Sequence, residues 1–141
     1  MAYALQFEKL LEYDVSDSGV NVDITLTLNK KTVTLTAKID TGASCCVFAR
    51  NQAEELGIAV EQGMRQLFAT ATGDFLAYGH EVTLSVAGFE FDSFVFFAAD
   101  EHIKRCVLGR FGWLDRIVLG LFDYEGKLYL NAYATELVHT R

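Results

Sequence analysis

The chain has 141 residues, of which 51% are apolar and 22% are charged, so its composition is that of a folded globular protein. Its formal net charge of −7 and the lack of a basic stripe argue against nucleic acid as the main partner and against a polybasic membrane anchor. A chain of this length is expected to form a single domain, residues 1–141, with a core of its own.

The N-terminal residues lack the basic flank and the apolar centre of a signal peptide, and no apolar run is long enough to span a bilayer. The three cysteines, two of which are adjacent, do not have the spacing of a disulfide framework. Together these features predict a reducing, intracellular setting, and we expect a cytoplasmic protein that does not contact a membrane.

The first clear element along the chain is a hairpin. Residues 1–13 are mixed in character and fit either an edge strand or a short helix. From Val20 to Leu28, apolar residues alternate with Asn, Asp and Thr, which is the period of a half-buried strand. A polar turn at 29–31 leads into a second alternating run, from Val33 to Ile39, and two such runs around a short turn predict a hairpin.

Asp40, Thr41 and Gly42 follow the second strand directly. An acid at the end of a buried strand is costly unless it is solvated or used, and glycine lets the backbone come close. The segment 17–19 has a similar Asp-Ser-Gly pattern, but no apolar strand precedes it and its neighbours are typical of a turn. The strand therefore distinguishes Asp40 as the functional acid.

After this segment, the pattern predicts a short helix over 50–56 that ends at Gly57. A long hairpin is expected over 67–78, with its tip near Thr72, Gly73 and Asp74 and a positive φ at the glycine.

The remaining elements are again mostly short strands, expected at 81–86 and 89–98, then a buried strand within 106–109. A short helix over 110–116 and a last hairpin over 117–131 complete the pattern, whereas the tail from 132 shows none. Many strands with little helix predict an all-β fold, either closed or sandwiched.

The segment Asp40-Thr41-Gly42-Ala43-Ser44 after an apolar strand resembles the active-site loop of aspartic proteases, and the chain length is similar to that of the retropepsin branch. Val107-Leu108-Gly109 resembles the second family signature, a strand that passes under this loop, and Arg110 resembles the arginine that often follows it. The resemblance covers about Val20 to Asn131. It implies a closed β-barrel of the acid-protease fold, one lobe per chain, with one or two short helices.

The resemblance also implies the activity, which is that of an aspartic endopeptidase working as a homodimer. Two adjacent carboxylates cannot both ionise comfortably, so they share one proton and together activate water. Each chain would supply one Asp40, without metal or cofactor, and the partners would be a second copy and a peptide or protein substrate. Thr41 would lock the two loops together, and Gly42 would hydrogen-bond the acid. Substrate would contact Ala43, Ser44 and the flap tip at Thr72, Gly73 and Asp74.

One departure from the family leaves an alternative open. In many viral members an acid stands at the position of Ser44 and pairs with the arginine at the position of Arg110, a pair that Ser44 cannot form. The alternative is a catalytically silent, dimeric binding or assembly module with the same fold. A thiol enzyme is disfavoured because Cys45 and Cys46 point to opposite faces of extended chain. The cysteine and histidine spacings also match no familiar zinc site.

Overall fold

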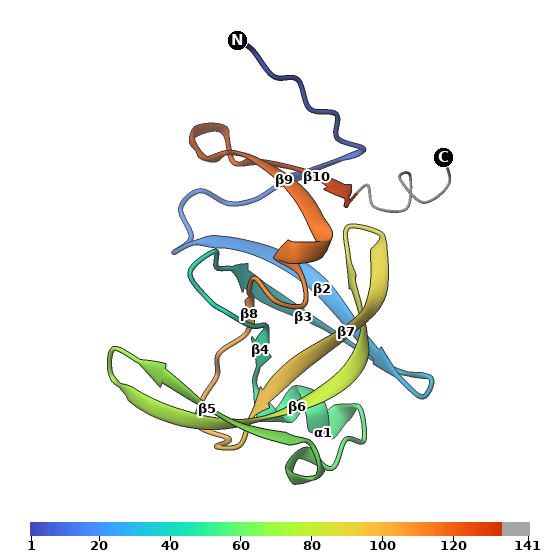
Figure 1. Cartoon of the computed structure of the whole chain (residues 1–141), viewed down its shortest axis with the longest axis vertical. Coiled ribbons are helices and arrows are strands. Elements are labelled where there is room, and N and C mark those ends of the chain that lie inside the picture. Colours follow the sequence, from blue (N-terminus) through green and yellow to red (C-terminus); the bar gives the residue numbers. More distant parts are fainter. Residues whose placement is uncertain (134–141) are drawn as a thin grey trace.

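A computed structural model describes residues 1–133, and its first hairpin is the predicted one, except that the second strand begins at Lys31 and not at Val33 (Figure 1). Strands β2 (Val20–Leu28) and β3 (Lys31–Ile39) pair in antiparallel register along their full length. The two residues between them, Asn29 and Lys30, both have positive φ, as hairpins with two-residue turns require. Alternation along β3 buries Val33, Leu35 and Ala37, so one face of the hairpin belongs to the core.

Seven strands form the main sheet, in the order β2-β3-β8-β4-β7-β6-β5, and an additional pairing between β2 and β6 closes a ring. The ring confirms the predicted all-β architecture, and it surrounds a core that includes Leu26, Phe48, Leu84 and Phe97. The strands not yet given are β4 (Val47–Phe48), β5 (Met64–Thr70), β6 (Gly73–Val86), β7 (Phe89–Ala98) and β8 (Val107–Leu108).

Helical structure is confined to short elements. Helix α1 (Arg50–Glu55) ends as predicted, with Gly57 at a φ of +75°, and η1 (Val60–Gln62) follows it. The helix predicted over 110–116 is wrong except for one 3-10 turn, η2 (Leu114–Arg116). Phe111 instead bridges to Cys45, and Gly112 has a φ of +104°, so the backbone cannot continue a helix there.

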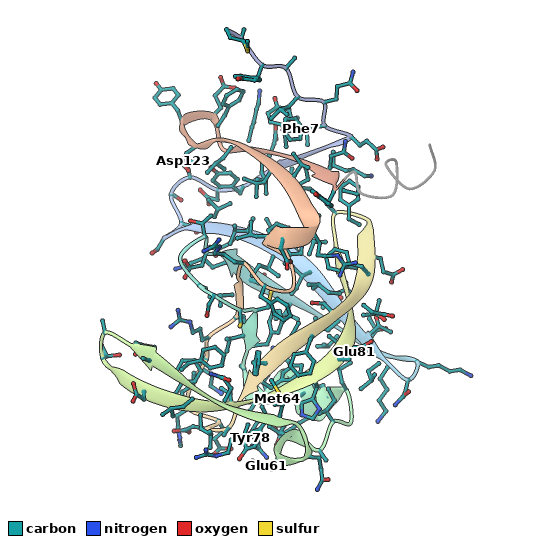
Figure 2. The ribbon with its side chains drawn as sticks, in the orientation of Figure 1. Phe7, Glu61, Met64, Tyr78, Glu81 and Asp123 are labelled. Carbon is teal, nitrogen blue, oxygen red and sulfur yellow. The ribbon has the colours of Figure 1, made fainter. Side chains whose placement is uncertain are left out.

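A second sheet of three strands caps one end of the ring, in the order β1-β10-β9. It contains β1 (Lys9–Glu12), β9 (Ile117–Phe122) and β10 (Lys127–Ala132), with η3 (Asp123–Glu125) between the last two. Of the ambiguous N-terminal segment, residues 1–13, only Lys9–Glu12 form a strand, at the edge of this sheet, and the last predicted hairpin is confirmed. Figure 2 shows Phe7 and Asp123 at this end of the molecule, opposite to Met64 and Tyr78.

Two sequence-based expectations have a limited outcome here. The predicted single domain spans residues 1–141. Residues 134–141, in the tail for which the sequence predicts no element, lie outside the described residues, so the domain prediction stays a prediction. Within residues 1–133, no helix combines the length and the apolar character needed to cross a bilayer.

Candidate active site

The Asp-Thr-Gly loop, residues 40–46, is fixed by hydrogen bonds from its first residue onwards. The Asp40 amide donates to the Leu108 carbonyl at 3.0 Å, and the Ala43 amide donates to the Asp40 carbonyl at 3.1 Å. The Gly42 amide donates to Asp40 Oδ1 at 2.9 Å, which is the bond that the resemblance implies. One carboxylate oxygen is thus held by the loop itself, and the side chain remains about one third exposed, at 35%.

Strand β8 supports this loop from below, as expected for the second signature. It runs parallel to β3, with Lys38 opposite Val107 and Ile39 opposite Leu108. Gly109 packs against the carbonyl of Cys45 so closely that a Cβ on Gly109 would overlap it. A glycine at this position therefore allows the two backbones to meet.

Backbone hydrogen bonds replace the side-chain pair that Ser44 cannot form. The amide of Arg110 donates to the Ala43 carbonyl at 2.9 Å, and the amide of Phe111 donates to the Ser44 carbonyl at 2.8 Å. The Arg110 side chain is exposed and forms no ion pair with any residue in 1–133. The loop and the signature strand are joined here without an acid at position 44.

Cys46, at the end of the loop, and Cys106, just before β8, are in surroundings that make their thiols unreactive. Cys46 is buried, accepts a hydrogen bond from the Gly109 amide at 3.4 Å, and has a pKa raised by burial to about 12. Burial also raises the pKa of Cys106. Both thiols therefore stay protonated at neutral pH, and protonated thiols are poor nucleophiles. Among residues 1–133, no group of three or more His, Cys, Asp and Glu side chains is placed to hold a metal ion.

The predicted flap is a long two-stranded arm, residues 64–79, formed by β5 and the part of β6 that pairs with it. Its turn is at 71–72, one residue earlier than predicted, because Thr70 pairs with Gly73. Gly73 has the predicted positive φ, +133°, and the space beside its Cα is empty. In Figure 1 the arm reaches out on the same side of the molecule as the chain between β3 and β4.

Aromatic side chains connect the arm to the ring. The rings of Phe68 and Phe75 stack across the two strands with centroids 5.5 Å apart, and Phe68 meets Phe96 of β7 edge-on at 5.1 Å. Most other residues of β5 are exposed. The outer part of the arm is thus held mainly by this small cluster.

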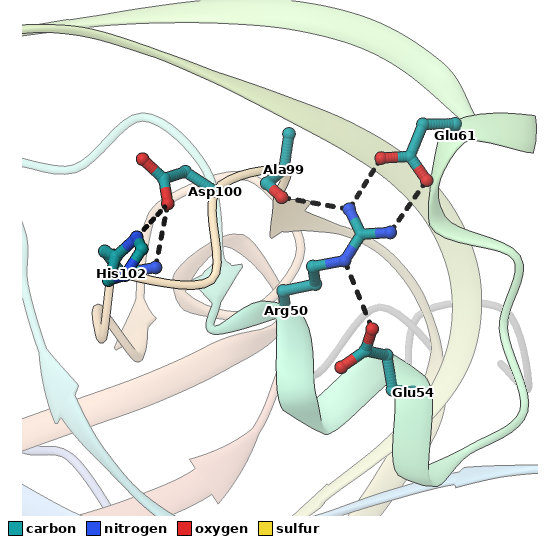
Figure 3. Close-up of polar contacts among 6 residues, drawn as sticks. All are labelled: Arg50, Glu54, Glu61, Ala99, Asp100 and His102. Atoms are coloured by element: carbon teal, nitrogen blue, oxygen red, sulfur yellow. Dashed lines mark hydrogen bonds and ion pairs between the residues drawn. The ribbon is translucent and has the colours of Figure 1, made fainter.

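The base of the arm is fixed by Arg50 at the start of α1 (Figure 3). Its guanidinium donates to both carboxylate oxygens of Glu61, at 2.6 and 2.9 Å, to Glu54 at 3.3 Å and to the Ala99 carbonyl at 2.9 Å. Donation by Arg50 lowers the pKa of Glu61. Glu61 lies just before β5 and Ala99 just after β7, so one side chain ties the base of the arm to the helix.

Two cavities open between the loop and the arm, and Asp40 lines the larger of them. The larger, about 740 Å³, is lined by Asp40, Val107 and the flap-tip residues Thr72, Gly73 and Asp74. The smaller, about 170 Å³, is lined by Gly42, Ala43, Ser44, Val107 and the aromatic pair of the arm. The structure therefore brings most of the predicted site residues together. The other predicted site residues line neither cavity. Thr41, next to Asp40 in the chain, is exposed; Leu108 and Gly109, which follow Val107, are buried; and Arg110 is exposed.

Sequence reasoning missed three cationic residues of the larger cavity, Lys38, Lys104 and Arg105. Arg105 Nη2 lies 3.8 Å from Asp40 Oδ2, the oxygen that the loop leaves free. The signal for Lys38 was present in the strand period, since residues two apart on a strand share a face, and Lys38 precedes Asp40 by two. Arg105 precedes Val107 by two, but only the pairing of β8 with β3 brings it to the cavity, and the sequence gives no local signal for that pairing.

Comparisons with known proteins agree with this geometry. A family model described as aspartyl protease matches residues 24–120, whereas no curated protein matches the sequence. A retropepsin-like aspartic protease from Rickettsia conorii is similar in structure, with a TM-score of 0.63 and 18% identity over 87% of this chain and 97% of that chain. The protease of EIAV in complex with the inhibitor HBY-793 has a TM-score of 0.52 and 18% identity over 67% and 84%. These similarities show that the fold is retropepsin-like.

Proposed function

This chain belongs to the aspartyl protease family, and we propose that it is an endopeptidase whose catalytic centre is completed by a second copy of the same chain. The observation that carries the proposal is the Asp40 loop, which presents a single carboxylate to the larger cavity on a rigid support. A metal-free aspartic centre needs two carboxylates, so a two-fold axis beside Asp40 would supply the second.

In such a dimer the two Asp40 carboxylates share one proton. The ionised carboxylate takes a proton from a water molecule, whose oxygen attacks the peptide carbonyl carbon while the protonated carboxyl group donates a hydrogen bond to the carbonyl oxygen. The tetrahedral intermediate then breaks its C–N bond as a proton passes to the leaving nitrogen. Gly42 keeps each carboxylate oriented through its amide, and Thr41, which is exposed beside it, would contact its counterpart across the axis.

The substrate would bind as an extended strand between the loop and the arm, held by backbone hydrogen bonds. Thr72, Gly73 and Asp74 would close over it, while Ala43 and Ser44 line the smaller cavity from below. Because closure excludes all water other than the attacking molecule, the arm would act as a lid on the reaction.

The test compares the wild type with Asp40→Asn on an unfolded polypeptide, from acid to neutral pH, with and without pepstatin. We expect cleavage that requires Asp40 and is blocked by pepstatin. A wild-type protein that is folded and dimeric but cuts nothing over this pH range would rule out the endopeptidase.

A second candidate function is a silent binding module of the same fold. The contact between Arg105 and Asp40 favours it, because a guanidinium at 3.8 Å competes with a second carboxylate for the same oxygen. Sedimentation at high protein concentration complements the cleavage test: a protein that stays monomeric favours the module, and so does a dimer that cleaves no peptide, whereas a dimer that cleaves favours the enzyme.

A further inference from the structure

The larger cavity beside Asp40 gathers positive charge in a protein whose net charge is −7. Three of the 12 lysine and arginine residues of the chain line it, namely Lys38, Lys104 and Arg105. The smaller cavity, by contrast, is lined mostly by apolar side chains and backbone, with Arg105 at its border. The two cavities therefore differ in charge.

Strand register explains how these cations come together. Lys38 and Asp40 lie on the same, outward face of the β3 segment, and Lys38 is paired with Val107 of β8. Arg105, two residues before Val107, then comes to the same face. The stem of Lys38 also lies against Gly19, where an added Cβ would meet it at 2.7 Å. The turn at 17–19 thus helps to hold this lysine in place.

The carboxylates of the protein do not neutralise this cluster. Two of them, Asp40 and Asp74, also line the cavity, and the only ion pair there among the described residues is the long one between Arg105 and Asp40. Lys38 and Lys104 have no acidic partner within 4.0 Å in residues 1–133. Cations that line a cavity without a partner favour the entry of an anion, which gains charge-assisted hydrogen bonds.

We propose that the larger cavity is a specificity subsite for a carboxylate side chain, so that the enzyme prefers peptides with Glu or Asp at a residue flanking the scissile bond. The inference rests on the proposed function. The subsite lies next to the bond that is cut, because Asp40 itself lines the cavity and Arg105 reaches to 3.8 Å from it. Binding of an acidic side chain would also draw Arg105 from Asp40 and free that oxygen for the reaction.

The experiment uses the wild-type enzyme on a peptide mixture and on matched peptides that differ only by Glu or Gln at the preferred position. We expect cleavage sites enriched in acidic residues on one side of the cut bond. The kcat/KM for the Glu peptide should exceed that for the Gln peptide by about three- to tenfold, since the carboxylate would face more than one cation. The ratio should fall as salt is added, because partly exposed charges are screened.

A double variant, Lys38→Met with Lys104→Met, should lower the ratio toward one, with the remaining preference due to Arg105, and Lys30→Gln, in the remote hairpin turn, should leave it unchanged. Because the ratio is internal to each protein, a general loss of activity does not affect it. Should the double variant fail to fold, the wild-type ratio and its salt dependence decide alone. Equal cleavage of the Glu and Gln peptides overturns the inference and leaves the protease intact, whereas a folded dimer that cleaves no peptide overturns both.

Discussion

The Asp-Thr-Gly loop and the flap arm lie on either side of the same cavities but are held in different ways. The loop is joined to β8 and the residues after it by backbone hydrogen bonds and by the close contact at Gly109. The arm is held at its base by Arg50 and by pairing of Ala77 with Ala98 of β7, and farther out only by a few phenylalanine rings. The comparison indicates that the fold holds Asp40 rigidly and attaches the outer part of the arm more weakly, as expected for a lid that must open and close.

The same substitution in both regions gives the largest predicted effect. Gly109→Ala forces a Cβ into the Cys45 carbonyl and should cost more than about 3 kcal/mol in the free energy of unfolding. Gly73→Ala meets no neighbouring atom and only strains a positive φ, so we expect a loss of about 1 kcal/mol. Urea unfolding of both variants measures the difference, and equal losses would contradict it.

Removing an aromatic ring from the arm should affect activity more than stability. Phe68→Ala loses its contacts with Phe75 and Phe96, which weakens the closed arm. We expect a fall in kcat/KM of about three- to tenfold, the effect of an aromatic pair worth about 0.5–1.5 kcal/mol. Leu67→Ala, on the exposed face of the same strand, is the matched control and should keep the wild-type kcat/KM. Equal effects of the two variants would show that the rings do not position the arm.

The smallest predicted effect is at the base of the arm and depends on pH. Arg50 lowers the pKa of Glu61 in the folded protein, so this ion pair stabilises the fold above the ordinary carboxyl pKa. The stabilisation is lost as the pH falls through the lowered value. Glu61→Gln should therefore lower Tm by about 2 °C or less at neutral pH and have no effect in strong acid. Thermal unfolding at a series of pH values measures the Tm difference between wild type and Glu61→Gln, with Glu55→Gln as the control. A Tm difference that grows as the pH falls would contradict the prediction.

Much of the loop and the ring could be predicted from the sequence because local pattern and tertiary structure agree there. The alternation in β2 and β3 reports directly which face is buried. The bounds of β2 and β7 were predicted correctly, whereas β3 begins at Lys31, two residues before the predicted start at Val33. The apolar strand before Asp40 distinguished the Asp-Thr-Gly pattern there from the similar Asp-Ser-Gly pattern of the turn at 17–19. The family model and the fold confirm the family to which these motifs pointed.

The misses come from contacts between residues far apart in the chain. Strand β1 depends on pairing with β10, about 120 positions later, which no local pattern reports. The helix predicted over 110–116 is prevented by the bridge between Phe111 and Cys45. The cationic cavity requires β3 and β8 to lie side by side, so Lys38 alone could be placed from its own strand, while Arg105 could not.

Mixing subunits tests most directly whether two chains share one catalytic centre. A fixed amount of wild type is refolded together with increasing Asp40→Asn, and peptide cleavage is measured at saturating substrate. If each centre needs Asp40 from both copies, an equal amount of the variant should halve the activity, and a tenfold excess should reduce it to about one tenth. Activity that stays constant while mixed dimers form would contradict the account, because each chain would then be catalytic by itself.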